Sequence, residues 1–137
     1  MRIRGILGRI AAAALCVGAL GVAIAAAHVV KYPTGSSSIE YANLDDPDST
    51  DFFSGKVSAK KKSCKAKRRV AVFRDTPGVD QEVGSDRTTG AGSWKVFADN
   101  VPTGDYYADS DRKTLKLTVD HRHVCRAVRS QTIQAGP

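Results

Sequence analysis

The side chains most suited to binding or chemistry form a run of seven cations around Cys64. They lie within ten residues and are Lys60, Lys61, Lys62, Lys65, Lys67, Arg68 and Arg69. Such a run can neutralise the phosphate or carboxylate groups of a polyanion, with an affinity that falls steeply as salt rises. The alternative is a solvated hairpin loop that keeps a secreted domain soluble. We favour the loop and predict no specific nucleic-acid partner, because no aromatic residue interleaves with the cations to stack on bases.

The second candidate site is the pair His121 and His123, which would share one side of an extended strand. Two imidazoles can begin a metal site, but no third ligand is identifiable and the pair falls at an expected turn. Exposed turn histidines are the favoured interpretation, and we predict no metal and no other cofactor. The Gly-x-Ser-x-Gly and phosphate-loop motifs are missing. We therefore predict no catalytic residues, and favour a non-enzymatic protein over a small metal-dependent enzyme.

The amino terminus has the basic, apolar and small-residue order of a secretory signal. Arg2, Arg4 and Arg9 precede an uncharged run that ends in three alanines immediately before His28. This order predicts a signal peptide over residues 1–27 and a secreted or extracytoplasmic protein at the cell surface. The alternative is an uncleaved anchor helix, since residues 10–30 are just long enough to span a bilayer. Only in that case would the chain have a membrane as a partner.

Export also bears on the cysteines and on the charge. Removal of residues 1–27 takes away Cys16 and leaves Cys64 and Cys125 as the only thiols in an oxidising compartment. This predicts one disulfide, which would close a loop of about 60 residues and stabilise the fold by roughly 4 kcal/mol on chain-entropy grounds. The alternative is two unrelated buried thiols. The same cleavage removes three arginines from a net charge of +7 and leaves +4.

The mature chain divides into an acidic segment and a basic one. Residues 28–51 carry one lysine against five acids, with interspersed Pro, Gly and Ser, a composition typical of a flexible linker. Residues 52–137 hold 17 Lys and Arg against 9 acids. Apolar and β-branched runs between turn residues predict seven strands, at 52–58, 69–74, 81–86, 93–97, 105–109, 114–119 and 123–133.

Seven short strands predict that residues 52–137 form a single all-β domain, an antiparallel Ig-like sandwich. Side chains two residues apart on a strand share a face. Trp94 and Val96 are therefore expected to enter the core together, and Tyr106 and Ala108 likewise.

Two segments of this domain carry a recognisable pattern. They read TTGAGSWKV over residues 88–96 and VPTGDYYA over residues 101–108. Together they resemble the T-x-x-x-G-x-(Y/W)-x-(V/F) … P-x-G-x-Y pattern of prealbumin-like β-sandwich modules, which include carboxypeptidase regulatory-like and collagen-adhesin B-type repeats. The neighbouring strands also look like those of small secreted actinobacterial proteins of unassigned function. The resemblance implies a prealbumin-like sandwich with Trp94 and Tyr106 in its core, and it implies no particular activity.

These features together predict an exported, non-enzymatic β-sandwich module with a structural or binding role at the cell surface or outside the cell. The alternative is polyanion or cell-envelope binding through residues 60–69. An anionic cell-envelope polymer and another surface protein are the two kinds of partner that this interpretation allows, and the sequence does not identify which.

Overall fold

The structure is a computed structural model that describes residues 28–44, 50–116 and 121–137. The predicted signal peptide, residues 1–27, lies outside the described residues. The described elements are short strands and one single-turn helix. In chain order they are β1 (His28–Tyr32), β2 (Ser36–Ser37), β3 (Glu40–Ala42), β4 (Phe52–Ser58), α1 (Lys62–Lys65), β5 (Arg69–Arg74), β6 (Gln81–Arg87), β7 (Ser93–Phe97), β8 (Gly104–Ser110), β9 (Lys113–Lys116), β10 (His121–Cys125), β11 (Val128–Arg129) and β12 (Ile133–Ala135).

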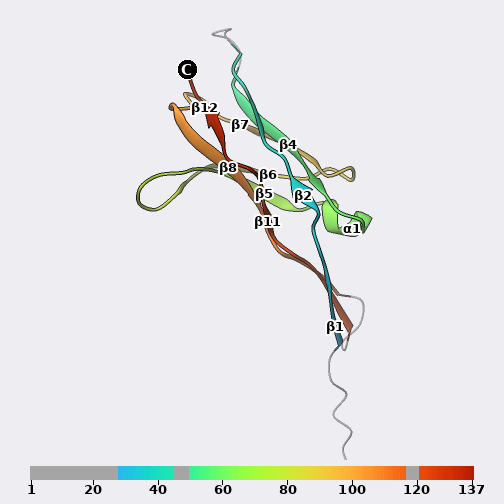
Figure 1. Cartoon of the computed structure of the whole chain (residues 1–137). Coiled ribbons are helices and arrows are strands. Elements are labelled where there is room, and N and C mark those ends of the chain that lie inside the picture. The colour runs from blue at the N-terminus through green and yellow to red at the C-terminus, as the bar shows by residue number, and fades with distance from the viewer. Residues whose placement is uncertain (1–27, 45–49, 117–120) are drawn as a thin grey trace, which may run out of the picture.

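Two antiparallel sheets build a sandwich-like body. The first has the order β11-β8-β5-β6, and β12 also pairs with β8. The second is centred on β4, which pairs with β7 along one edge and with β2 and β3 in succession along the other. A third sheet, β1-β10-β9, extends from one end of this body, opposite the end where the carboxyl terminus lies (Figure 1). β1 and β10 pair in parallel, whereas the other strand pairs of the described residues are antiparallel.

The core fills the space between the two larger sheets. β7 alternates, burying Trp94 and Val96 while it exposes the residues between and beside them. Tyr106 and Ala108 of β8 are fully buried on the opposite sheet, and Phe53 of β4 stacks on the Tyr106 ring at 5.0 Å between centroids. The predicted inward faces of both strands are therefore confirmed, as period-two burial requires.

Close packing of the second sheet depends on Gly55 in the middle of β4. A Cβ at this position would overlap the carbonyl oxygen of Ser38 and come within 2.7 Å of the Trp94 ring. A residue with a side chain at this position would therefore require the Ser38 backbone and the Trp94 ring to shift. β6 and β7 meet at the side of the sandwich, where the Lys95 amide donates to Asp86 Oδ2 at 2.9 Å.

Three of the seven predicted strands have the observed bounds. The predictions 52–58, 69–74 and 93–97 coincide with β4, β5 and β7, while β6 and β8 extend one or two residues beyond 81–86 and 105–109. The prediction 114–119 overlaps β9, and residues 117–120 lie outside the described part. The single strand predicted at 123–133 is wrong: the chain leaves β9 after β10 and joins β8 through β11 and β12. Within residues 52–137, the described part of the chain holds nine strands, β4 to β12, where seven were predicted.

The prediction of a flexible linker over residues 28–51 is wrong for most of its described part. β1 pairs with β10, β2 and β3 pair with β4, and Ile39 between them is 1% exposed. The physical reason is that these are edge strands, held by backbone hydrogen bonds to a neighbour, which need few apolar side chains of their own.

Candidate functional site

The predicted cation run extends from the loop after β4, through α1, to the first residue of β5 (Figure 1). Its central residue, Cys64 of α1, forms a disulfide with Cys125 at the end of β10, with an S–S distance of 2.06 Å and a Cα–Cα distance of 5.4 Å. Both cysteines are fully buried. The predicted pairing is confirmed. The bond ties residues 60–69, called the cationic segment below, to the third sheet.

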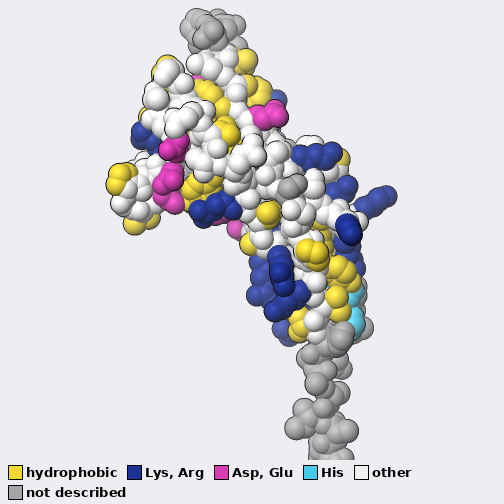
Figure 2. All heavy atoms as spheres, in the orientation of Figure 1, with side chains coloured by type: hydrophobic (Ala, Val, Ile, Leu, Met, Phe, Trp, Pro, Cys, Tyr) yellow, Lys and Arg dark blue, Asp and Glu magenta, His cyan; other side chains and the backbone are white. Residues whose placement is uncertain are grey.

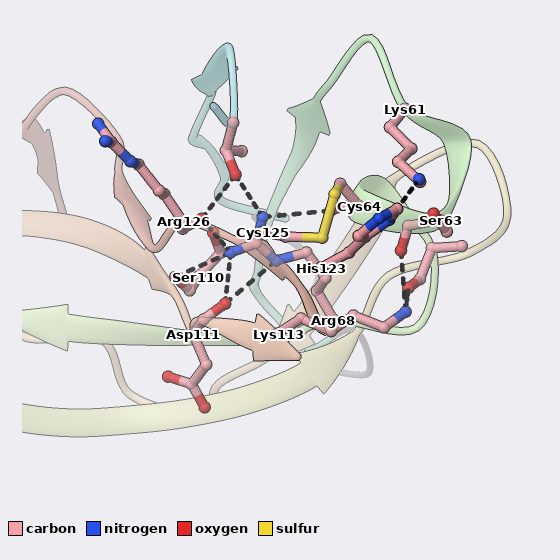
Figure 3. Close-up of a disulfide and its surroundings, with 12 residues drawn as sticks. Lys61, Ser63, Cys64, Arg68, Ser110, Asp111, Lys113, His123, Cys125 and Arg126 are labelled. Atoms are coloured by element: carbon pink, nitrogen blue, oxygen red, sulfur yellow. Dashed lines mark hydrogen bonds between the residues drawn. A yellow bond between two sulfur atoms is a disulfide. The ribbon is translucent and has the colours of Figure 1, made fainter. Parts of the chain in front are cut away.

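Arg68 does not belong to the solvent-facing cations, because its side chain is buried at 1% exposure. Its guanidinium group lies beside the disulfide and donates to oxygen atoms from several segments (Figure 3). Nη1 donates to Thr34 Oγ1 at 2.7 Å and to the Cys64 carbonyl at 3.2 Å, and Nη2 donates to the Arg126 carbonyl at 2.7 Å. Nε and Nη2 both donate to the Asp111 carbonyl, and Nη2 also reaches the Ser110 carbonyl at 3.5 Å.

The buried environment of Arg68 lowers the pKa of its side chain. Burial lowers the pKa of the guanidinium group, and the nearby charge of Asp111 opposes this shift only in part. The group remains a cation because arginine keeps its proton far above neutral pH. Arg68 is thus an internal connector whose donors are used by backbone and hydroxyl oxygens, and it is not available to an external ligand.

Arg69 is the second member of the run that the structure separates from the others. It begins β5, and its guanidinium group forms ion pairs with Glu82 at 2.5 Å and with Asp111 at 3.7 Å. Both acids raise the pKa of Arg69, the hydrogen bond to Glu82 being the largest cause. Its positive charge is largely compensated by these two neighbours, so it adds little to an anion-binding surface.

Lys61 points toward the third sheet, where it meets the two histidines. Its Nζ lies 3.0 Å from His123 Nδ1 and 4.2 Å from the centre of the Tyr32 ring. An ammonium group only donates, so His123 Nδ1 accepts from Lys61, and a neutral His123 then carries its proton on Nε2. That nitrogen lies 2.9 Å from His121 Nε2, to which it donates.

The interpretation of His121 and His123 as exposed turn residues is wrong. Both lie on β10, His123 is 8% exposed and His121 is half-buried. Their side chains do share one side of the strand, as the two-residue spacing requires. Within residues 28–44, 50–116 and 121–137, no three His, Cys, Asp or Glu side chains gather as a metal-binding group. Over the same residues, no helix has the length and apolar character needed to span a membrane.

Four lysines of the run form no ion pair within the described part of the chain. Among the described residues, no carboxylate lies within ion-pairing distance of Lys60, Lys62, Lys65 or Lys67. Figure 2 shows that Lys and Arg side chains gather mainly on the middle and lower parts of this face, near α1 and toward β1, while the visible Asp and Glu side chains lie in the upper half.

Lys113 lies next to α1 and is surrounded by other cations. Its Nζ donates to the carbonyl oxygens of Ser63 and Ala66, at 3.0 and 2.5 Å, and so holds the helix from below (Figure 3). Burial lowers the pKa of Lys113, and the charges of Arg68, Lys67 and Arg87 lower it further. Cations from outside residues 60–69, such as Lys113 and Arg87, therefore add to the positive charge around the cationic segment.

Two members of the run, Lys60 and Lys65, line an open cleft of about 380 Å³ together with Lys56 of β4. Backbone from Gly35 and Ser58 completes its wall. Sequence reasoning missed Lys56, which lies outside the basic run. Strand alternation would have found it, since Lys56 and Ser58 flank the buried Val57 and must face outward together.

No protein-family model, curated protein or solved structure matches this chain.

Proposed function

We propose that this protein is an exported, non-enzymatic β-sandwich module with a structural or binding role at the cell surface or outside the cell. The observation that carries the proposal is the Cys64–Cys125 bond, which ties α1 to β10. Disulfides persist in oxidising compartments and stabilise small domains with limited cores. The basic, apolar and small-residue order of residues 1–27 supports the same compartment.

The most perturbed polar groups support a structural or binding role over a catalytic one. Strongly perturbed groups are candidates for functional sites in general. Here they satisfy internal hydrogen bonds: the Tyr107 hydroxyl donates to Asp80 at 2.5 Å, and the Tyr41 hydroxyl donates to Asp51 at 2.6 Å. Burial and these hydrogen bonds raise the pKa of each tyrosine to about 12. Arg68 is used in the same way.

We also assign the sandwich to the prealbumin-like modules. The residues that carry the resemblance support it: Gly92 has a φ of 92°, and Trp94 and Tyr106 are buried in the core. An experimentally determined structure tests this assignment. A strand connectivity shared with carboxypeptidase regulatory-like modules would support it, and an unrelated connectivity would refute it.

Intact mass spectrometry of the protein from its native host tests export directly. We expect a chain that begins near His28, is two hydrogens lighter than the reduced form and resists alkylation without reductant. A full-length chain with alkylated Cys64 and Cys125 would contradict both export and the oxidised state on which the proposal depends.

A second candidate function is binding of a polyanion or cell-envelope polymer through the cationic segment. The observation that favours it is the exposure of Lys60, Lys62 and Lys67 with no described carboxylate within ion-pairing distance. Cations that lack internal partners keep their charge available to an external anion, and binding would weaken steeply as salt rises.

Retention on heparin–agarose tests this second function. The test variant replaces three exposed cationic-segment residues with glutamine: Lys60, Lys62 and Lys67. The control variant removes the same charge from exposed residues elsewhere: Lys31, Lys95 and Arg122. We expect the test variant to elute at a much lower salt concentration than the control. Equal losses would mean that net charge alone retains the protein, and would refute a specific surface.

A further inference from the structure

We propose that the cleft between β2, β4 and α1 binds a phosphate group through Lys56, Lys60 and Lys65. This inference rests on the second candidate function, polyanion binding, and names a subsite and a ligand chemistry for it. Two of its lysines belong to the basic run, and the third, Lys56, reaches the cleft from the neighbouring strand. Tertiary structure thus assembles three cations that are spread over ten residues of sequence.

The cleft has the charge and size for a small oxyanion. Its described lining contains three lysines and no carboxylate, so its walls carry a net charge of +3. None of the three lysines forms an ion pair with a described acid. A volume of about 380 Å³ is at the lower end of ligand-binding clefts, and it accepts a phosphate with part of its attached chain.

The backbone around the cleft is held in place before any ligand arrives. The Gly35 amide donates to the Ser58 carbonyl at 2.8 Å, which fixes the wall opposite α1. The Lys65 carbonyl accepts from Thr88 Oγ1 at 2.6 Å. Gly92 packs beneath, where an added Cβ would overlap the Val57 carbonyl oxygen and lie 3.3 Å from Lys65 Cβ. Lysine side chains on a rigid backbone lose less entropy on binding than side chains on a mobile loop.

The chemistry of the lining favours phosphate over other anions. Lysine binds phosphate as a point charge, and the cleft offers three such charges. A phosphate monoester or a terminal phosphate presents three negative oxygen atoms to these ammonium groups, against two in a carboxylate, and carries a charge of about −1.5 to −2 at neutral pH. The described lining holds no aromatic side chain on which a base could stack, so the ligand is a phosphate-bearing polymer or lipid and not a single-stranded nucleic acid.

Binding of the mature, oxidised chain to inorganic polyphosphate tests the cleft. The test variant is Lys56→Gln with Lys65→Gln, and the control is Lys31→Gln with Lys95→Gln. Each variant loses two positive charges, and neither changes Arg68 or Arg69. At an ionic strength of about 0.15 M, we expect the test variant to bind about tenfold more weakly and the control about as tightly as the parent. The slope of log affinity against log salt should fall by about 1.5 in the test variant, for two lost phosphate contacts. Matching thermal unfolding of all three proteins controls for folding.

The outcomes separate this inference from the function on which it rests. If the parent binds heparin and polyphosphate, but the test and control variants weaken equally, the cleft assignment is wrong and the second function stands. If the parent binds neither probe, that function itself fails. Vesicles of phosphatidylcholine with and without phosphatidylglycerol identify the source: cleft-dependent binding to the anionic vesicles assigns the phosphate to a lipid, and cleft-dependent binding to polyphosphate alone assigns it to a polymer. Tighter binding to single-stranded DNA than to polyphosphate would overturn the proposal.

Discussion

Replacing Arg68 with alanine removes the donor group that connects the cationic segment to the rest of the protein. The guanidinium group is 1% exposed and donates to five oxygen acceptors, which truncation would leave without this donor. They are Thr34 Oγ1 and the carbonyl oxygens of Cys64, Ser110, Asp111 and Arg126. The Arg126 carbonyl still accepts from Thr34 Oγ1 at 2.6 Å, so four acceptors lose their donor. At about 1 kcal/mol for each of these four, the free energy of unfolding falls by about 4 kcal/mol. Water that enters the truncated site reduces this loss to about 3 kcal/mol.

Urea denaturation and thermal melts of the oxidised protein measure this loss. A decrease of about 3 to 4 kcal/mol lowers the melting temperature by roughly 12 to 16 °C in a domain of this size. The control is Arg69→Ala, which removes a half-exposed arginine whose ion pairs contribute no more than about 1 kcal/mol. Arg68→Met is a second test, because it fills most of the space but donates nothing, and it should also destabilise. If Arg68→Ala costs no more than Arg69→Ala, the role of Arg68 as an internal connector is refuted.

Three further predictions follow from other contacts. Replacing Cys64 and Cys125 together with serine should lower the free energy of unfolding by about 4 kcal/mol, measured by urea denaturation, since the bond closes a 61-residue separation; an unchanged midpoint would contradict it. Gly92→Ala should destabilise by about 1 kcal/mol or more because of its φ of 92° and the overlap with the Val57 carbonyl. Gly90→Ala, where an added Cβ meets nothing within 4 Å, is the control, and equal melting temperatures would refute the reasoning. The pKa of Tyr107 is raised to about 12, so its contribution to the free energy of unfolding is complete below pH 10 and is lost as the pH rises through 12. Tyr107→Phe should therefore reduce the loss of stability at alkaline pH, measured by denaturation at several pH values. An unchanged pH profile would count against this role.

Local sequence patterns predicted most closely those strands whose apolar residues lie between polar or turn residues. β4, β5 and β7 have the predicted bounds because apolar residues recur in them between clear turn residues. The region after residue 120 was predicted as one strand, since its residues have similar β-propensity throughout. Whether a strand continues or changes sheet depends on the neighbour that its backbone meets, and that neighbour is far away in sequence. The same reason explains why β1, β2 and β3 were missed in a polar segment.

In the cationic segment, too, the environment of each side chain depends on residues that are distant in sequence. Lys67, Arg68 and Arg69 are adjacent and have the same charge, so no sequence rule separates them. In the fold, Lys67 is exposed, Arg68 is buried among carbonyl oxygens and Arg69 is paired with acids. Lys56, which the basic run does not include, joins Lys60 and Lys65 at the cleft.

Residue types and their order were enough to predict the all-β class, the inward faces of β7 and β8 and the pairing of Cys64 with Cys125. These depend on side-chain type, on period-two alternation and on the number of cysteines, all of which are local or countable. Which cations face solvent and which residues line the cleft became clear from the folded structure alone. Burial and charge compensation depend on segments brought together from across the chain, and those contacts are not encoded in any short stretch of it.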